Sequence, residues 1–188
     1  MKRFSSVLPV VLVALAFMFG MTSLAMATQI VYRTPKQMGE QASLVVQGKV
    51  TSVRSFWNER RTKIFTETFV QIDEAYKGTN PGSVRIIQLG GTVGKIKVTV
   101  AGALQWRPGE EVLLFLEEAT PDAYHVSGFS QGKFSVERDP VTGEAFVRRP
   151  ALEGAEVLGA PPSEEPMTTS RVVKVPLTQF IDDALSRR

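Results

Sequence analysis

Residues 44–57 read LVVQGKVTSVRSFW, and this stretch decides how the rest of the chain is interpreted. It is rich in β-branched residues and has no proline, which predicts a strand of about ten residues or more. Leu44, Val46 and Val50 share one face, with Gly48 among them. A glycine inside a strand packs nothing, so it indicates a sharp bend or a close approach by another backbone. A strand bent in its middle can pair with different neighbours at its two ends, which is how small barrels close.

Further strands are predicted on both sides of a glycine-rich stretch. Their apolar or alternating residues lie at 64–76, 83–89, 96–100, 111–117, 123–129, 133–137 and 144–148. The stretch 111–117, EVLLFLE, is nearly continuous in apolar residues, which predicts a strand that is covered on both faces. Residues 90–102 predict a flexible excursion with the short strand 96–100 inside it.

Two helices are expected outside these strands. Thr34, Pro35 and Gln37 form a capping box with proline at the first helical position, which predicts a short helix over 35–42. A terminal helix begins at Pro176, and its apolar residues Leu177, Phe180, Ile181, Ala184 and Leu185 share one face. We therefore expect a barrel domain over 28–150, a flexible linker over 151–170, and a terminal strand and helix over 171–188 that dock on the barrel.

The first 27 residues predict a signal peptide. Lys2 and Arg3 precede an apolar stretch over 7–19, and Ala25-Met26-Ala27 is a small-x-small cleavage site. The alternative is a retained N-terminal anchor. We expect an exported protein, periplasmic or extracellular, that starts near Thr28, has no membrane span after cleavage and is a monomer.

Composition excludes several classes of function. The chain has no cysteine, which excludes disulfides, thiol catalysis and thiolate zinc sites. Its 22 Lys and Arg against 19 Asp and Glu give a charge of +3, which becomes +1 without Lys2 and Arg3. A domain so close to neutral is a poor candidate for binding nucleic acid, which calls for a basic face.

Two motifs hint at catalysis but lack the rest of their pattern. Residues 128–132, GFSQG, match the G-x-S-x-G of a serine hydrolase, yet the only histidine, His125, precedes Ser130 and a strand follows it. Residues 90–95 hint at a phosphate-binding loop, but the required residues at 89 and 96 are absent. The sequence also has no residues at the spacing typical of metal ligands. We therefore expect no catalytic residue, no metal and no cofactor.

Aromatic and arginine side chains mark the candidate binding residues. Trp57 and Trp106 are expected at strand ends beside charged loops, a composition found at interface anchors and also at the plugged end of a barrel. We expect a binding surface along one barrel end, and its candidate residues are Trp57, Arg60, Arg61, Gly90, Gly91, Gly94 and Trp106.

The order of elements resembles known proteins. The segments ASLVVQGKV (42–50), AYKG (75–78), PGEEVLLFL (108–116) and YHVSGFSQGKFSVE (124–137) are similar to a group of exported bacterial proteins of unknown function. More distantly they resemble the OB-fold domain of netrin C-termini and of tissue inhibitors of metalloproteinases. The resemblance implies a mainly β, OB-like, partly closed barrel of five or six strands with helices packed outside, and a protein-binding role. The inhibitors' N-terminal cysteine has no counterpart here, so no inhibitory residue transfers.

These observations together predict a non-catalytic binding module whose partner is a protein of the cell envelope or the medium. Four alternatives remain: a protease-inhibitor-like protein, a structural envelope component, a serine hydrolase that uses Ser130 and His125, and an oligosaccharide-binding barrel.

Overall fold

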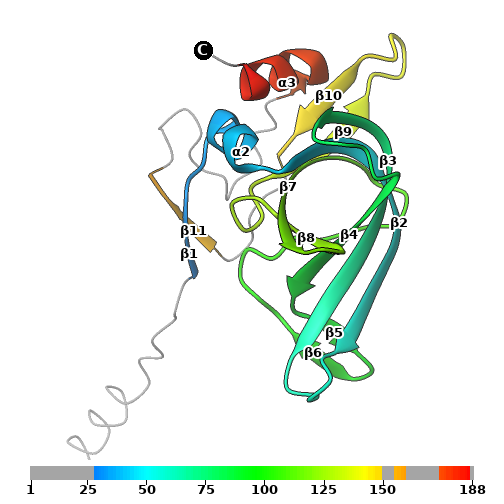
Figure 1. The fold of residues 1–188 in the computed structure, drawn as a ribbon, viewed down its shortest axis with the longest axis vertical. Coiled ribbons are helices and arrows are strands. Elements are labelled where there is room, and N and C mark those ends of the chain that lie inside the picture. Colours follow the sequence, from blue (N-terminus) through cyan, green and yellow to red (C-terminus); the bar gives the residue numbers. More distant parts are fainter. Residues whose placement is uncertain (1–27, 150–154, 160–173, 187–188) are drawn as a thin grey trace, which may run out of the picture.

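The computed structural model describes residues 28–149, 155–159 and 174–186, and in these residues it shows a β-rich fold with two helices (Figure 1). The elements are β1 (Thr28–Val31), α2 (Pro35–Gln41), β2 (Leu44–Trp57), β3 (Ile64–Lys77), β4 (Ser83–Leu89), β5 (Gly91–Val93), β6 (Ile96–Val98), β7 (Glu111–Thr120), β8 (Ala123–Val126), β9 (Lys133–Arg138), β10 (Ala145–Arg148), β11 (Ala155–Leu158), β12 (Val175–Pro176) and α3 (Leu177–Leu185). The proposed signal peptide, residues 1–27, lies outside the described residues.

The long strand β2 is present as predicted, and Gly48 sits where two backbones meet. A Cβ at Gly48 would overlap the carbonyl oxygen of Gln71 on β3, and the pairing register with β3 shifts between Gln47 and Gly48. Of the two reasons expected for this glycine, a sharp bend or a close approach by another backbone, the structure shows the close approach. The pairing differs from the prediction in one respect, because β2 pairs with β3 over almost its whole length and with β7 only over 44–49.

Five strands close into a ring. Their order is β7-β2-β3-β4-β8, and β8 pairs back onto β7 (Figure 1). The neighbours are antiparallel except for β4 and β8, which run parallel and meet at Ile86 and Tyr124. The strands β9, β10 and β12 continue the sheet beyond β7.

Strand β7 separates two hydrophobic cores, which confirms the prediction that it is covered on both faces. Val112, Leu114 and Leu116 belong to the inner core that fills the ring, while Leu113 and Phe115 belong to the outer core under the helices. Other members of the inner core are Leu44, Val46, Val50, Val70, Ile72, Val84, Ile86, Leu104 and Val126. The continuous apolar pattern of this strand is thus explained by a neighbour on each side.

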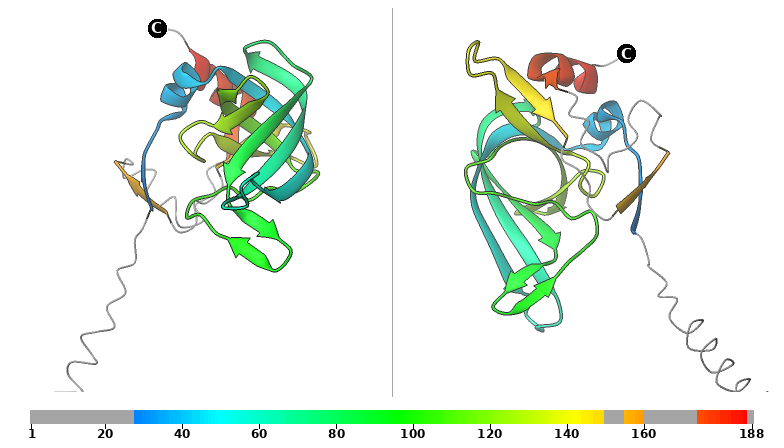
Figure 2. Two further views of the ribbon diagram at one scale, coloured as in Figure 1. Left: turned by 60° about the horizontal axis from the view of Figure 1, so that its bottom comes forward. Right: turned by 180° about the vertical axis from the view of Figure 1, so that it is seen from behind.

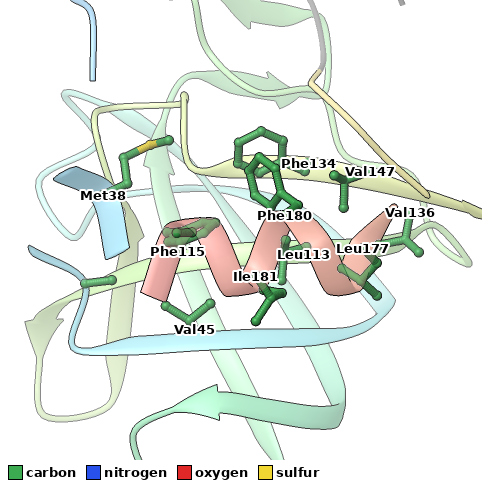
Figure 3. Packing of buried hydrophobic residues seen from close by; sticks show 12 residues of the cluster. Met38, Val45, Leu113, Phe115, Phe134, Val136, Val147, Leu177, Phe180 and Ile181 are labelled. Atoms are coloured by element: carbon green, nitrogen blue, oxygen red, sulfur yellow. The ribbon is translucent and has the colours of Figure 1, made fainter. Parts of the chain in front are cut away.

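The outer core is built around three aromatic rings and is closed by α3 (Figure 3). The ring centroids of Phe115 and Phe134 lie 5.9 Å apart, and those of Phe134 and Phe180 lie 4.7 Å apart. Leu177, Phe180, Ile181 and Ala184 of α3 are all buried, so the predicted apolar face of the terminal helix is confirmed.

Helix α2 has the predicted start, and its glycine has a role in packing. The Thr34 hydroxyl accepts the N–H of Gln37, and the Gln37 side chain accepts the N–H of Thr34, so the capping box is complete. A Cβ at Gly39 would overlap the carbonyl oxygen of Ala184, so this glycine lets α3 approach α2 closely.

The predicted linker contains a strand. Residues 155–158 form β11, which pairs in parallel with β1, and the N–H of Tyr32 donates to the carbonyl oxygen of Leu158 at 2.9 Å. Composition alone missed this pairing because its partner lies more than a hundred residues away. The predicted terminal strand over 171–175 falls mostly outside the described residues, and its described end is the two-residue strand β12, paired with β10.

Candidate binding site

The turn between β2 and β3 is organised by Asn58. Its side-chain oxygen accepts the N–H groups of Thr62 and Lys63 at 2.8 and 3.0 Å, and its carbonyl oxygen accepts the N–H of Arg61 at 2.8 Å. Arg61 has a φ of 50°, a left-handed conformation that side chains other than Gly, Asn and Asp rarely adopt. The turn therefore holds Arg60 and Arg61 in exposed positions at the end of the β2–β3 ribbon.

Two of the predicted glycines carry the chain from β4 across the end of this ribbon. The N–H of Gly90 donates to the carbonyl oxygen of Ile64 at 2.8 Å, and the hydroxyl of Thr66 donates to the carbonyl oxygen of Gly90 at 2.8 Å. A Cβ at Gly91 would overlap the hydroxyls of Ser55 and Thr66. This part of the stretch is thus bonded to the ribbon, in contrast to the flexible excursion that the sequence predicts.

The stretch continues as a small hairpin of β5 and β6, whose two-residue turn begins at Gly94. That glycine has a φ of 60°, which glycine adopts without strain. Ile96 and Val98 of β6 remain 52% and 37% exposed, which is unusual for two neighbouring aliphatic residues on one strand face. Lys95 and Lys97 are exposed beside them.

The turn and the hairpin lie at the same end of the molecule (Figure 2), and the N–H of Thr92 on β5 donates to the hydroxyl of Ser55 on β2 at 3.2 Å. We call this end the basic tip. It is defined by Trp57, Glu59, Arg60, Arg61, Lys63, Lys95, Ile96, Lys97 and Val98.

The basic tip carries more net positive charge than residues 28–188 do as a whole. It contains five cationic side chains and one carboxylate, whereas all of residues 28–188 together carry a net charge of only +1. None of the five cations forms an ion pair with any residue that the structure describes. The rest of residues 28–188 is therefore slightly acidic, and the tip is a local cationic surface with aliphatic side chains in it.

The nearest buried carboxylate on the ribbon is neutralised by other arginines. Glu67 of β3 accepts hydrogen bonds from Arg54 at 2.9 Å and from Arg85 at 2.6 Å. Burial would raise the pKa of Glu67, but the hydrogen bonds from Arg85 and Arg54 outweigh it and hold that pKa below its ordinary value. The charge of Arg54 is thus matched within the fold, whereas the cations of the tip have no ion-pair partner in the described part of the chain.

The two tryptophans, which the sequence places in similar surroundings, do different things. Trp57 is the last residue of β2, lies opposite Ile64 and is half-buried. It therefore lies at the basic tip, and so does Gly90. Trp106 lies in the segment before β7, packs against the inner core, and donates from Nε1 to the side-chain oxygen of Gln88 at 3.0 Å. Trp106 therefore fits the packing alternative rather than the binding surface.

Beside Trp106 lies a buried ion pair. Lys133 Nζ contacts both carboxylate oxygens of Glu110 at 2.8 and 2.9 Å, donates to the carbonyl oxygen of Gln105 at 2.7 Å, and lies 4.7 Å from the centroid of the Trp106 ring. Burial lowers the pKa of Lys133, and Glu110 opposes that shift. Each charge has a partner here, so the arrangement joins β9 to the segment before β7.

Ser130 and His125 each lie in surroundings of their own. The Ser130 hydroxyl is buried and has no hydrogen-bond partner, while Nδ1 of His125 lies 2.8 Å from the carbonyl oxygen of Ile87. Neither side chain is therefore hydrogen-bonded to the other, although a histidine that activates a serine must reach its hydroxyl. Gly128 and Phe129 both have positive φ values, so the GFSQG stretch forms a tight turn before β9.

Within the described part of the chain, no group of three or more potential metal ligands comes together, and no helix is both long and apolar enough to cross a bilayer. Comparison with models of known protein families gives no match, and comparison with curated proteins gives none either.

The sequence analysis proposed some residues of the basic tip as binding residues and not others. It proposed Trp57, Arg60, Arg61 and the glycines, but it did not propose Lys95, Ile96, Lys97 and Val98 as binding residues. A signal was present, because 95–98 alternates cationic and aliphatic residues. Pairing with β5 shows that this segment is a strand, and a strand places the two aliphatic residues on one face.

Proposed function

We propose that this protein is an exported, non-catalytic binding module that captures a protein partner of the cell envelope or the medium through the basic tip. The observation that supports this most is the tip itself, where exposed Ile96 and Val98 lie among five cations without ion-pair partners among the described residues. Exposed aliphatic groups beside arginine are a combination found at protein interfaces.

We also infer that the five-stranded ring is an OB-like barrel. In the sheet, β7, β2, β3 and β4 stand in the order 4-1-2-3 of a Greek key, and β8 closes the ring. OB barrels are small Greek-key barrels that bind ligands on their second and third strands and on the loop between their first two strands. The corresponding loop here is the turn over 58–63, so the basic tip lies where this class of barrel places ligands, an argument from fold analogy.

Export is inferred from residues 1–27, whose basic start, apolar stretch and Ala25-Met26-Ala27 fit a signal peptide. A non-catalytic role is inferred from the lack of a hydrogen bond between Ser130 and His125. No cofactor is proposed, and the module is proposed to act as a monomer.

The test is crosslinking in the native envelope fraction followed by mass spectrometry. A double variant, Arg60→Glu with Arg61→Glu, is expected to remove the crosslinked protein that the parent chain captures. The matched control is Lys49→Glu with Lys36→Glu, which changes two cations outside the tip by the same charge and is expected to retain capture. Equal capture by both double variants would refute the tip as the binding surface.

A second pair of variants separates binding from packing. Trp57→Ala and Arg61→Ala are each expected to weaken capture with little change in melting temperature, because Arg61 is exposed and Trp57 is half-buried. A large loss of melting temperature for Trp57→Ala, with capture intact at low temperature, would show that this tryptophan only plugs the end of the ring.

A further inference from the structure

We propose that the basic tip recognises an extended segment of its partner in which apolar and acidic residues alternate, and that this segment adds to the hairpin as a third strand along β6. This inference rests on the proposed function, since it specifies the chemistry of the partner.

The first argument is the edge of the hairpin. Among the described residues β6 pairs with β5 only, through Ile96 opposite Val93 and Val98 opposite Gly91. Because the turn has two residues, these two are the hydrogen-bonded pairs of the hairpin. The N–H and C=O of Lys97 therefore point away from β5, where a new strand can bond them.

The second argument is the alternation of side chains along that edge. Ile96 and Val98 lie on one face of the hairpin, and Lys97 lies on the other face with Thr92. A strand added beside β6 places its own residues on the same two faces in turn. Apolar residues would then cover Ile96 and Val98, and acidic residues would meet Lys97 and the neighbouring cations of the tip.

The third argument concerns the other occupants. A second copy of this chain would place lysine opposite lysine, and like charges across a strand pair are destabilising. A lipid surface is bound best by a broad apolar face that carries large aromatic or aliphatic residues. The exposed aliphatic residues of β6 are two short side chains on a three-residue strand. A strand with acidic residues would pair with the cations of the tip and would also hydrogen-bond to the outer edge of β6.

The experiment uses the full chain and a fluorescein-labelled hexapeptide in which valine and glutamate alternate. Fluorescence anisotropy is expected to show at least tenfold tighter binding of this peptide than of the matching valine–lysine peptide. Hydrogen exchange of the Lys97 amide is expected to slow at least tenfold when the peptide is bound, since that amide becomes a hydrogen-bond donor.

Two variants of one residue separate charge from edge pairing. Lys97→Gln removes the charge but keeps the N–H, and is expected to weaken binding several-fold. Lys97→Pro also removes the outward N–H while leaving the bonds to β5, and is expected to abolish binding. Unchanged melting temperatures would show that both variants fold. Equal peptide binding by the two variants would refute strand addition.

The remaining outcomes are also decisive. Binding to vesicles of anionic phospholipid without binding to the peptide, or dimerisation in sedimentation at the assay concentration, would overturn the inference in favour of a membrane or of a second copy. If the peptide fails to bind while Arg60→Glu with Arg61→Glu still abolishes envelope crosslinking, strand addition is wrong and the proposed function stands. If both experiments fail, the proposed function is wrong as well.

Discussion

Replacement of Gly48 by alanine tests the close approach of β2 to β3 inside the ring. The added methyl group would point into the ring, overlap the carbonyl oxygen of Gln71 and lie 3.0 Å from Cγ1 of Val70. An ordinary contact begins near 3.4 Å, so the strands must separate by about 0.4 Å at Val70 and by more at Gln71.

The expected change in the free energy of unfolding follows from two opposing effects. Overpacking of a filled core costs typically about 1–3 kcal/mol, and the upper end applies here because the obstacle is backbone on the paired strand. Alanine also restricts the unfolded chain, which returns up to about 1 kcal/mol. The expected loss is therefore about 2 kcal/mol, or about 4–8 °C in melting temperature for a chain of this size.

Urea unfolding followed by circular dichroism measures this loss. The matched control is Lys49→Ala, because Lys49 is the next residue on β2, points outward and is exposed, so its free energy of unfolding should change by less than about 0.5 kcal/mol. If Gly48→Ala is as stable as Lys49→Ala, the two strands are free to separate at this point and the reasoning about Gly48 is wrong.

Other predictions concern charged and hydrogen-bonded groups. Glu67→Gln should lower the free energy of unfolding at neutral pH by about 1–3 kcal/mol. The lowered pKa of Glu67 contributes stability that is present above pH 4.5 and is lost as the pH falls through the folded pKa. Urea unfolding at a series of pH values should therefore show a smaller loss of stability in acid for the variant than for the parent. Burial and the neighbouring Glu74 raise the pKa of Tyr76 to about 12, so the stability that this shift contributes is complete below pH 10 and is lost between pH 10 and 12. Solvent screening limits this contribution to about 1 kcal/mol. In thermal melts at alkaline pH, Tyr76→Phe should remove the loss of stability that the parent shows over this range. Lys133→Met should cost about 3 kcal/mol because it leaves the Glu110 carboxylate without its cation, and adding Glu110→Gln should restore part of that loss; a double variant no more stable than the single one would argue against the pairing.

The features that could be predicted from the sequence are those with a local signal. The capping box at Thr34 and Gln37 is visible within four residues, and the apolar face of 177–185 is visible in its periodicity. The glycine in the middle of 44–57 indicated either a sharp bend or a close approach by another backbone, because a glycine packs nothing inside a strand. The capping box and the apolar helix face depend on neighbours in sequence, which explains why they were confirmed. The residue that Gly48 approaches, Gln71, lies on another strand and had no local signal.

The features that could not be predicted depend on distant partners. The pairing of β1 with β11 joins Thr28–Val31 to residues inside a stretch whose composition predicts a linker. The hairpin of β5 and β6 is another case, because a glycine-rich stretch predicts mobility until Gly90 is seen bonded to Ile64. For the candidate site, the sequence located the turn that holds Arg60 and Arg61. The alternation of Lys97 with its aliphatic neighbours indicated a binding edge only after the pairing of β6 was known.

The position of α3 has a consequence for how the molecule is made. Met38 and Phe115 stay without a complete cover until residues 177–185 have left the ribosome, because Phe180 and Ala184 complete the cluster around them. The ring, by contrast, needs no residue beyond Val126 for its five strands. A nascent chain can thus complete the five-stranded ring early and still expose Phe115 and Phe134 until Phe180, in the first turn of α3, packs against both rings. During that interval the two rings are accessible to a holdase chaperone.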